Sequence, residues 1–484
     1  VSIGAVHSAG GAATYFASDN YYTAEQAEMT SGWAGEGAKL AGLEGTVDAA
    51  VFEKVLNGQL PNGRQVGDPE TRDHGRDFTF SMPKSASLLA YVSGDKRILA
   101  AHMEAVKETM AWVESNLAET RIKVEGKAVP IRTGNLVYAL FAHDTSRKTD
   151  PQGHIHAVIT NMTQLPAEFR QPDKVDPKTG EITSDDGWRA WHNQTVYKQS
   201  ALMTSMTNAI FREKLEALGY TTEQTGKHGA FEVLGPNGEK IASTAIDGFS
   251  KRSADIKAKA EELGVTSPEG RREITQRTRD AKVDPGDRQT LADRWREEAR
   301  EYSYNGDEIY QAALAHTQDR PSLIDRARSA VTAAITDTST RLSDFLRQPS
   351  DPLVDRGLAA LTRSPSEART QYATASAVRI LSEREAAFAT NDIIKTALDL
   401  GERGVTPARV EQRIGELVTQ GQLVQEKSTR LDKAVDMVTT SDAIKQEMRI
   451  LAAMDAGIDA ARPLMPADIA AQKLQELAGD RTLN

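Results

Sequence analysis

The stretch that decides the fold spans residues 134–162 and reads GNLVYALFAHDTSRKTDPQGHIHAVITNM. Its two ends alternate in the manner of β-strands, and the middle, DTSRKTDPQG, suits a hairpin connection. Side chains two apart on a strand share a face, so His154 and His156 point the same way while Ile155 points to the other side. If the two strands pair, His143 reaches the same patch from the neighbouring strand.

Three imidazoles on one face of a sheet favour a metal site. They leave coordination positions open, as a catalytic ion requires. The alternative is a buried structural role, which is more common for a histidine that stands alone. A set of histidines without a carboxylate does not identify the ion, so Zn, Mn, Ni and Mg all stay open.

A third strand, RDFTFSM at residues 76–82, places Asp77 and Thr79 on one face and Phe78 and Phe80 on the other. Metal-binding histidines usually donate their second N–H to a carboxylate that fixes the orientation of the ring. Asp77 is the candidate for this role, and it could also help to take a proton from a phenol. The alternative is an ordinary acid at a strand edge.

Residues 1–300 mix strands and helices, which predicts an α+β fold, an antiparallel sheet covered by helices on one face. Residues 87–115 have helical spacing after Pro83, and residues 219–235 predict a β-hairpin that turns at Gly226 to Gly229.

The remainder of the chain divides into two parts. Residues 301–370 are rich in Arg, Ser, Pro and Asp and predict a helical or flexible linker. Residues 371–484 predict a small, mainly helical domain, with Thr406 as a helix N-cap and QLVQEK at 422–427 as a short strand. A winged-helix type module and a plain helical bundle fit this pattern equally well.

The 484 residues contain no cysteine, which excludes disulfides, thiolate nucleophiles and cysteine-based zinc sites and is consistent with a reducing compartment. We find neither a signal peptide nor a run of apolar residues long enough to span a membrane, so we expect a cytoplasmic protein. The net charge is −10, with −5 in residues 1–300 and −5 in the rest. Any contact with nucleic acid must therefore come from a local groove.

Three tyrosines, Tyr15, Tyr21 and Tyr22, lie within TYFASDNYY at residues 14–22. Packing in a core is one explanation. A chemical role is the other, because a phenol with a pKa near 10 becomes a nucleophile when a metal or a base helps it to ionise. Attack on a phosphodiester would give a phosphotyrosine ester and a free hydroxyl, a reversible exchange of one ester for another.

Four ordered stretches together resemble the conjugative relaxases of the relaxase-helicase type, the TraI/TrwC-like (MobF) group of HUH endonucleases. These stretches are SAGGAATYFASDNYY at 8–22, DFTFSMPKSAS at 77–87, residues 134–164, and GFSKRS at 248–253. The resemblance covers about residues 1–300. It implies a sheet with a central three-histidine metal site, and site- and strand-specific nicking of single-stranded DNA at a plasmid transfer origin for conjugation.

Carried over residue by residue, the resemblance implies that Tyr15 is the nucleophile and becomes linked to the 5′ end of the cut strand. Tyr21 and Tyr22 match a second pair that serves a later strand transfer. Asp77 matches the acid beside the metal ligands. The ligands themselves match His143, His154 and His156, and the ion in use would be Mg or Mn, with Zn or Ni also possible.

The chain departs from the family pattern near the site. Phe16 stands where relatives often have a second tyrosine, which leaves Tyr15 as the candidate there. Gly153 and Ile155 replace the more usual Leu and Thr around the histidines. Neither bears a ligand, so we expect the site to survive, with a looser hairpin at Gly153.

The expected partners are single-stranded origin DNA, accessory proteins of the relaxosome and a secretion-system coupling protein, for a monomer that does not insert into membranes. DNA contacts are predicted at Lys84, Arg147, Arg189, Lys227 and Arg252, and Trp188 and Trp191 would either stack on bases or lie in the core. A single basic residue is more often a solvated surface residue, which is the alternative for each of them.

Two rival classes are a metal-dependent phosphodiesterase in which water attacks, and a DNA-binding module that does not cut. A rolling-circle replication initiator would use the same chemistry as a relaxase. No G-x-x-x-x-G-K-[ST] phosphate loop occurs in the sequence, so helicase activity is not expected from these residues. By resemblance, the chain is the N-terminal fragment of a longer protein, and residues from about 374 resemble the start of a helicase half.

Overall fold

The structure is a computed structural model, and the ranges of the chain that it describes are residues 1–18, 31–171, 174–175, 182–183, 185–267, 270, 273–275, 278, 287–318, 351–355, 363–427, 434–458 and 465–478. No helix in these ranges is both long enough and apolar enough to cross a lipid bilayer.

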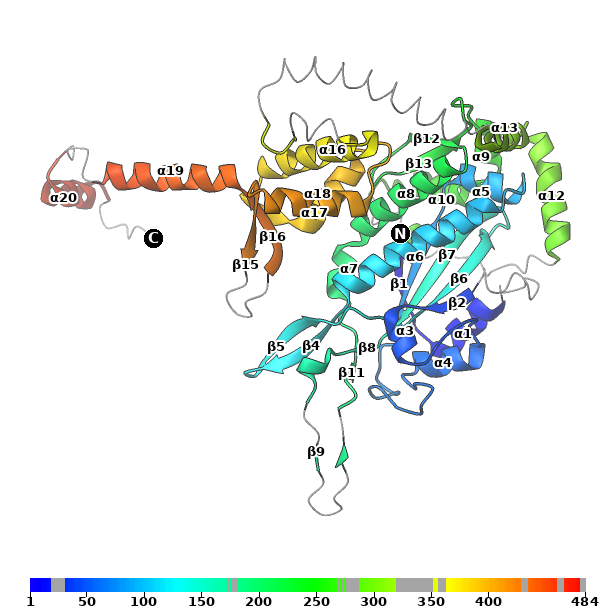
Figure 1. The fold of residues 1–484 in the computed structure, drawn as a ribbon, viewed down its shortest axis with the longest axis horizontal. Coiled ribbons are helices and arrows are strands. Elements are labelled where there is room, and N and C mark those ends of the chain that lie inside the picture. Colours follow the sequence, from blue (N-terminus) through cyan, green and yellow to red (C-terminus); the bar gives the residue numbers. More distant parts are fainter. Residues whose placement is uncertain are drawn as a thin grey trace.

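The main sheet of the described residues has five antiparallel strands in the order β1-β3-β7-β6-β2 (Figure 1). These strands are β1 (Ser2–Ala5), β2 (Ser31–Ala34), β3 (Gly75–Ser81), β6 (Tyr138–Thr145) and β7 (Pro151–Thr160). In the register of the sheet, His143 lies opposite His154, and Thr79 lies opposite His156. The strands predicted at 76–82 and 153–162 are therefore confirmed, and β7 pairs with both β3 and β6.

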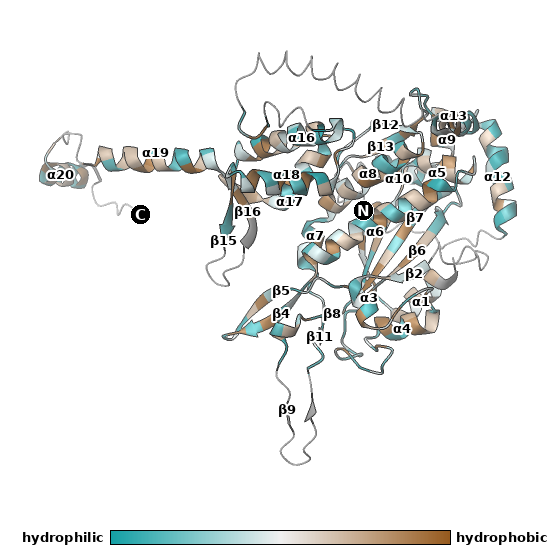
Figure 2. Cartoon of the chain, in the orientation of Figure 1, coloured by the Kyte–Doolittle hydropathy of each residue, from teal (hydrophilic) through white to brown (hydrophobic). Residues whose placement is uncertain are grey.

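One face of the sheet packs on the long helix α6 (Arg97–Leu117). Ile155, Phe78 and Phe80 point to this side, and all three are buried with apolar residues of α6. Burial of side chains of this size contributes about 1.5–3 kcal/mol each, which makes this layer a major source of stability. Figure 2 shows the apolar residues of the strands beneath the helices.

The second face, which carries the histidines, is also covered. Helices α1 (Ala9–Ser18) and α4 (Ala49–Leu56) pack there, and Phe16, Phe52, Phe141 and Val158 share their core. The prediction of a sheet covered on one face is thus wrong. The histidines lie between the sheet and the short N-terminal helix α1, because apolar residues of α1 pack on the apolar residues of β6 and β7 next to the histidines.

The helix predicted over residues 87–115 is two helices, α5 (Lys84–Tyr91) and α6. Gly94 between them has φ 81°, a conformation that favours glycine. The carboxylate of Asp95 then accepts hydrogen bonds from the Arg97 backbone amide at 3.1 Å and from the Tyr220 hydroxyl at 2.7 Å. Helical spacing continues through this break, so periodicity alone could not detect it.

Further helices and short strands complete the first part of the chain. The helices are α3 (Glu36–Leu40), η1 (Ala167–Phe169), α7 (Gln194–Lys198), α8 (Ser200–Ala217), α9 (Ser243–Gly248), α10 (Lys251–Glu262), α12 (Arg288–Glu301) and α13 (Gly306–Gln318). The strands are β4 (Glu119–Val124), β5 (Lys127–Arg132), β8 (Thr163–Gln164), β9 (Lys174–Val175), β10 (Ile182–Thr183), β11 (Trp188–Arg189), β12 (Thr221–Gln224) and β13 (Phe231–Leu234). Strands β12 and β13 form the hairpin predicted at 219–235.

Helix α13 belongs to the first core rather than to a separate segment. Its Ile309 and Ala313 are buried with residues of α5, α6 and α8. Residues 306–318, which the sequence places in a linker, therefore extend the packed unit beyond residue 300.

A second unit follows, and its elements are α16 (Pro365–Ser382), β14 (Ala387–Ala389), α17 (Thr390–Asp399), α18 (Pro407–Thr419), β15 (Leu423–Lys427) and β16 (Ala434–Thr440). Its three strands form an antiparallel sheet in the order β14-β16-β15. This is the winged-helix arrangement, with α17 and α18 as its helix-turn-helix. Thr406 precedes α18 as its N-cap, although its side chain makes no capping hydrogen bond.

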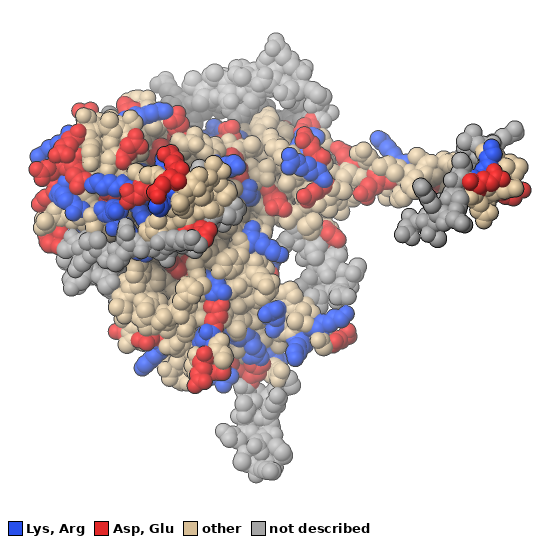
Figure 3. All heavy atoms as spheres, turned by 180° about the vertical axis from the view of Figure 1, so that it is seen from behind, with Lys and Arg blue, Asp and Glu red and all other residues tan. Residues whose placement is uncertain are grey.

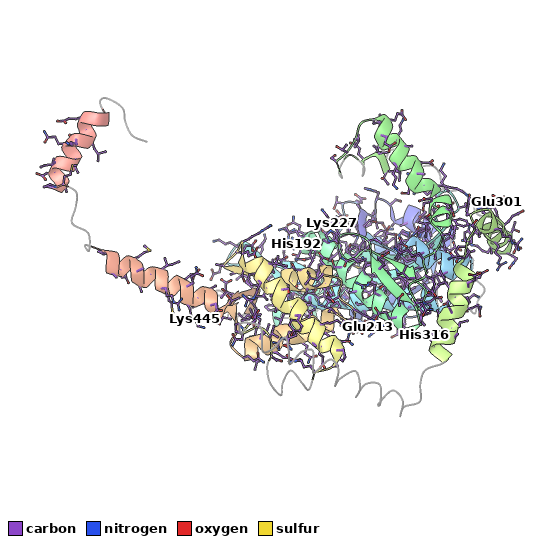
Figure 4. All side chains as sticks on the ribbon, turned by 90° about the horizontal axis from the view of Figure 1, so that it is seen from above. His192, Glu213, Lys227, Glu301, His316 and Lys445 are labelled. Atoms are coloured by element: carbon purple, nitrogen blue, oxygen red, sulfur yellow. The ribbon has the colours of Figure 1, made fainter. Side chains whose placement is uncertain are left out.

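The winged helix packs against α8 of the first unit. Leu202 and Met206 of α8 are buried in the core of the winged helix. Arg409 of α18 lies 2.7 Å from Glu213 of α8, which is labelled in Figure 4, and Asp399 accepts a hydrogen bond from Ser205 at 2.5 Å. Helices α19 (Ser441–Gly457) and α20 (Ala467–Ala478) extend away from this body (Figure 1).

Charges of both signs are interspersed over the face of the molecule shown in Figure 3. This agrees with the even division of the net charge between the two parts of the sequence. A basic surface for DNA must therefore be sought on individual elements.

Candidate metal centre

Three histidines converge on the α1 face of the sheet. His143 comes from β6, and His154 and His156 come from β7, with ring centroids 4.7–5.2 Å apart. One nitrogen of each ring lies within 4.8 Å of the corresponding nitrogens of the other two, and within the described part of the chain this is the group of three suited to a metal ion. The two-residue period of β7 and its pairing with β6 produce this convergence.

Asp77 holds one of these rings in place. Its two carboxylate oxygens lie 2.8 and 2.9 Å from Nδ1 of His156. A proton on Nδ1 would be donated to this carboxylate, which leaves Nε2 with its lone pair. The Nε2 atom of His156 is buried and has no hydrogen-bond partner among the described residues. A buried nitrogen in this state fits a metal ligand.

Burial keeps the other two rings neutral. Burial, together with the neighbouring imidazoles, lowers the pKa of His143 to about 2 and that of His154 to about 4. A neutral imidazole is the form that binds a metal, so these rings are ready to coordinate at neutral pH. The donor set of three imidazole nitrogens therefore fits a divalent cation.

Tyr15 lies beside the three histidines. Its ring centroid is 5.8 Å from that of His143 and 6.1 Å from that of His156. It is positioned by α1, whose start is capped by Ser8, since the Ser8 hydroxyl accepts a hydrogen bond from the Gly11 amide at 3.1 Å. The structure thus brings a phenol from the N-terminal helix to the group that the sequence suggested from two other segments.

Phe16 has a packing role that the sequence did not reveal. It is 4% exposed and stacks on Phe141 with centroids 4.9 Å apart. It also contacts His156, with centroids 5.1 Å apart. Phe16 thereby anchors α1 against the sheet and places Tyr15 over the histidines. The sequence signal for this role was its position next to Tyr15 in an apolar helix.

The structure also accounts for Gly153. A Cβ atom at this position would lie 2.4 Å from the Cε of Met82, so the methionine side chain occupies the space that a larger residue would need. The Gly153 amide donates to Ser87 Oγ at 3.0 Å, and its carbonyl accepts from the Met82 amide at 3.0 Å. The looser hairpin expected from the sequence is therefore not observed.

A cavity of about 330 Å³ lies mainly between the sheet and α6, on the face opposite α1, and reaches His143 and His154. It is lined by His143 and His154, and by Trp33 of β2 and by Met103 and Lys107 of α6. A mainly apolar cavity with an aromatic wall, next to a candidate metal site, could accept a flat organic group such as a nucleobase.

The basic residues predicted to bind DNA lie in different surroundings. Lys84 donates to the Pro151 carbonyl at 2.9 Å, and burial lowers its pKa to about 8. Arg189 donates to Asp185 at 2.5 Å, and Arg252 donates to Thr278 at 3.2 Å. Lys227, at the turn of the β12–β13 hairpin, is exposed (Figure 4).

The other predicted residues can be placed as follows. Arg147 is half-buried in the turn between β6 and β7. Trp188 and Trp191 are 6% and 4% exposed, so both are core residues. Tyr21 and Tyr22 lie outside the described residues.

One basic element of the fold was not predicted from the sequence. The hairpin of β4 and β5 projects from the body (Figure 1), and four of its basic residues are exposed. They are Arg121, Lys123, Lys127 and Arg132. The signal was available as alternating charge within TRIKV and KAVPIR, but these short runs resemble ordinary surface strands.

Comparison with known proteins identifies relatives. The TrwC relaxase family model matches residues 9–302 of this chain. The multifunctional conjugation protein TraI of Escherichia coli K12 is 41% identical over 264 residues, which are 53% of this chain and 14% of that protein. A second Escherichia coli TraI is 38% identical over 262 residues, again 14% of its length. The chain thus spans a small part of these curated relatives.

Solved structures give the same result. The conjugative relaxase TrwC in a copper-bound complex with oriT DNA superposes with a TM-score of 0.52 at 33% identity, covering 63% of this chain and 98% of that one. TrwC bound to a 27-mer DNA with the recognition hairpin and the cleavage site also has a TM-score of 0.52 at 33% identity, covering 63% and 99%. A metal-bound TrwC complex with oriT DNA has a TM-score of 0.53 at 34% identity, with the same coverage.

Proposed function

This chain belongs to the TrwC relaxase family, and from that premise we propose that it nicks one strand of DNA at a plasmid transfer origin with Tyr15 as the nucleophile. The observation that carries the proposal is the position of the Tyr15 ring against His143 and His156. A phenol and three imidazoles on one side of a sheet can engage the same phosphodiester. The TrwC structures bound to oriT DNA support this DNA as the substrate class.

We assign the ligands of a divalent cation to His143, His154 and His156, with Asp77 holding the ring of His156. A cation bound there would polarise a phosphodiester and favour the ionised phenol. Metal-bound relatives support a divalent ion in general. Mg or Mn is our choice for the working ion, because DNA phosphates supply the oxygen ligands that both prefer.

The proposed reaction exchanges one phosphate ester for another. The Tyr15 oxygen loses its proton and attacks the phosphorus, the P–O bond to the 3′ oxygen breaks, and that oxygen leaves as a free hydroxyl once protonated. The protein is then joined, through the Tyr15 oxygen, to the 5′ phosphate of the cut DNA strand. The direct hydrogen bond of Asp77 is to His156. Its negative charge close to the site could also help the Tyr15 phenol to lose its proton. Tyr21 and Tyr22 remain our candidates for a later transfer step.

Two surfaces could hold DNA. We propose that the exposed basic hairpin β4–β5 grips the duplex part of the origin, because a two-stranded ribbon fits a major groove and its four basic residues match phosphates. The cavity between the sheet and α6, which reaches His143 and His154, would take an unpaired base. All five basic residues predicted from the sequence stay predictions, and Lys84, Arg189 and Arg252 also bind protein groups.

A module that binds DNA through its winged helix without cutting is less consistent with the structure. The second helix of a helix-turn-helix normally enters the major groove. Here α18 directs Arg409 and Glu411 toward the first unit, where they contact Glu213 and Trp112. The exposed positions of α18 are Ala408, Gln412, Gly415 and Thr419, none of which is basic.

A denaturing gel tests the proposal. A labelled single-stranded origin oligonucleotide is incubated with the protein and Mn²⁺, and we expect a protein band that carries the label. Free cleaved DNA without an adduct would indicate a phosphodiesterase that uses water, and uncut DNA would indicate a binding module. Either result would overturn the proposal.

Tyrosine variants locate the nucleophile. Tyr15→Phe should abolish the adduct and leave DNA binding within about twofold. The matched control is Tyr372→Phe, since Tyr372 is 53% exposed on α16 in the second unit. If Tyr15→Phe still forms the adduct, mass spectrometry of the linked peptide would show whether Tyr21 or Tyr22 carries it. Partners beyond DNA, which are accessory proteins and a coupling protein, and the cytoplasmic location stay predictions.

A further inference from the structure

We propose that helices α10 and α12 position the metal ligands, with Arg288 as the principal positioning residue acting through Asp144. The inference rests on the proposed function, because it assumes that the three histidines bind a cation. Its basis is a set of contacts between these helices and the turn that joins His143 to His154. The GFSKRS stretch at 248–253, whose role was open, supplies one of these contacts.

The pairing of β6 with β7 is irregular directly beside a ligand. The register shifts between His143 and Thr145, so that Gln152 and Gly153 of β7 form a β-bulge opposite the single residue Asp144 of β6. Bulges commonly redirect a neighbouring side chain next to an active site. The bulge adjoins His154, and the opposing residue Asp144 adjoins His143, so the directions of these two rings depend on how this part of the hairpin is held.

Arg288, the first residue of α12, holds the bulge. Its guanidinium donates to the Asp144 carboxylate at 2.7 Å, and the Asp144 side chain is 8% exposed. An ion pair in such a place has a defined geometry, unlike the mobile pairs on protein surfaces. Fixing the Asp144 side chain fixes the backbone of the bulge and with it the orientation of His143.

The far end of the same turn is also held by α12. Thr149 has φ 59°, a conformation that is costly for a β-branched residue. Its carbonyl accepts from Trp295 Nε1 at 2.8 Å, and its hydroxyl accepts from Arg294 at 2.7 Å. These contacts from α12 stabilise a backbone that the turn would otherwise avoid.

Asp150 completes the arrangement. Its buried carboxylate accepts from the backbone amide of Lys251 in the GFSKRS stretch at 3.1 Å, and the Lys251 ammonium lies 3.5 Å away. The same ammonium lies 2.6 Å from Glu298 of α12. Lys251 therefore joins α10, α12 and the turn, so the two helices act on the histidine hairpin as one support.

The test measures Mn²⁺ affinity by titration calorimetry on the full chain. Loss of an outer partner of a metal ligand typically weakens binding about 10- to 100-fold. Because Arg288 acts through the backbone, we expect Arg288→Gln to weaken binding about tenfold, at the low end of that range. Arg288→Lys keeps the charge and should stay within about threefold of the unaltered protein.

A matched control and a double variant separate positioning from stability. Arg296 is on the same helix and pairs with Asp293 at the surface, so Arg296→Gln should leave Mn²⁺ affinity unchanged. Asp144→Asn with Arg288→Gln removes both charges of this ion pair. We expect this double variant to fold and to lose no more affinity than Arg288→Gln alone, because both changes remove one interaction.

The outcomes are distinct. Unaltered Mn²⁺ affinity in a folded double variant, or losses that add for the two single changes, would overturn the inference while the proposed function stands. Failure of the unaltered protein to bind any divalent ion would overturn the assumed metal site and this inference with it. A weakened affinity in Arg288→Gln that Arg288→Lys largely restores would support a positioning role.

Discussion

Replacing Asp77 with asparagine should weaken metal binding by about fivefold. The Asp77 carboxylate lies 2.8 and 2.9 Å from His156 Nδ1, and asparagine has nearly the same shape without the charge. Hydrogen bonds to a charged group contribute about 1.5–3 kcal/mol, against about 0.5–1.5 kcal/mol between neutral groups. The difference of about 1 kcal/mol corresponds to about fivefold in affinity. The Asp77 side chain is 24% exposed, so solvent keeps the effect near this value.

Asp77→Ala should have a larger effect, about 10- to 100-fold, because the ring of His156 then loses the partner that fixes its orientation and its tautomer. Titration calorimetry with Mn²⁺ measures both variants, and the adduct gel measures the consequence for nicking. Asp293→Asn is the control, since Asp293 is an exposed acid on α12. Equal affinity in the unaltered protein, Asp77→Asn and Asp77→Ala would refute the argument that the carboxylate orients a ligand.

Three further changes test other parts of the structure. Burial lowers the pKa of His143 to about 2, below its value of about 6.5 in the unfolded chain. As the pH falls below about 6.5, the unfolded chain binds a proton at this ring and the folded protein does not. The free energy of unfolding therefore decreases by at most about 1.4 kcal/mol for each pH unit of acidification. Metal-free His143→Gln should therefore show a shallower loss of stability between pH 6 and pH 4 in denaturant unfolding, and an unchanged slope would contradict this. Gly153→Leu should lower the free energy of unfolding by about 1–3 kcal/mol through its clash with Met82, and adding Met82→Ala should restore part of it. Leu202→Ala should cost about 2–5 kcal/mol and lower the calorimetric midpoint of both units, because Leu202 of α8 is buried in the winged-helix core; a shift in one unit alone would count against a shared core.

Local pattern was sufficient for the strands that carry the site. The alternation in residues 76–82 and 153–162 fixed which side chains share a face, and it placed His154 and His156 on the same side of β7. The hairpin at 219–235 followed from its glycines in the same way. These features depend on the two-residue period of a strand and on turn residues, both of which are local properties of the chain.

Local pattern failed where a break or a partner was set by distant residues. The interruption between α5 and α6 depends on Asp95, which binds Tyr220 far along the chain. The resemblance to relaxases named Tyr15 as the nucleophile, but the packing of Phe16 on Phe141 is what places that phenol near the histidines. Lys84 and Arg189 looked like surface cations, and their protein partners became visible only in the fold.

The sequence by itself determined the strand pattern, the pair of histidines on β7 and, through family resemblance, the chemistry to look for. The tertiary structure alone decided that α1 covers the histidine face, that α12 grips the bulge beside His143, and that α18 packs on α8. The physical reason is range. A strand's alternation is encoded in adjacent residues, whereas docking depends on matching surfaces from segments more than a hundred residues apart, as in the pair of Arg288 and Asp144.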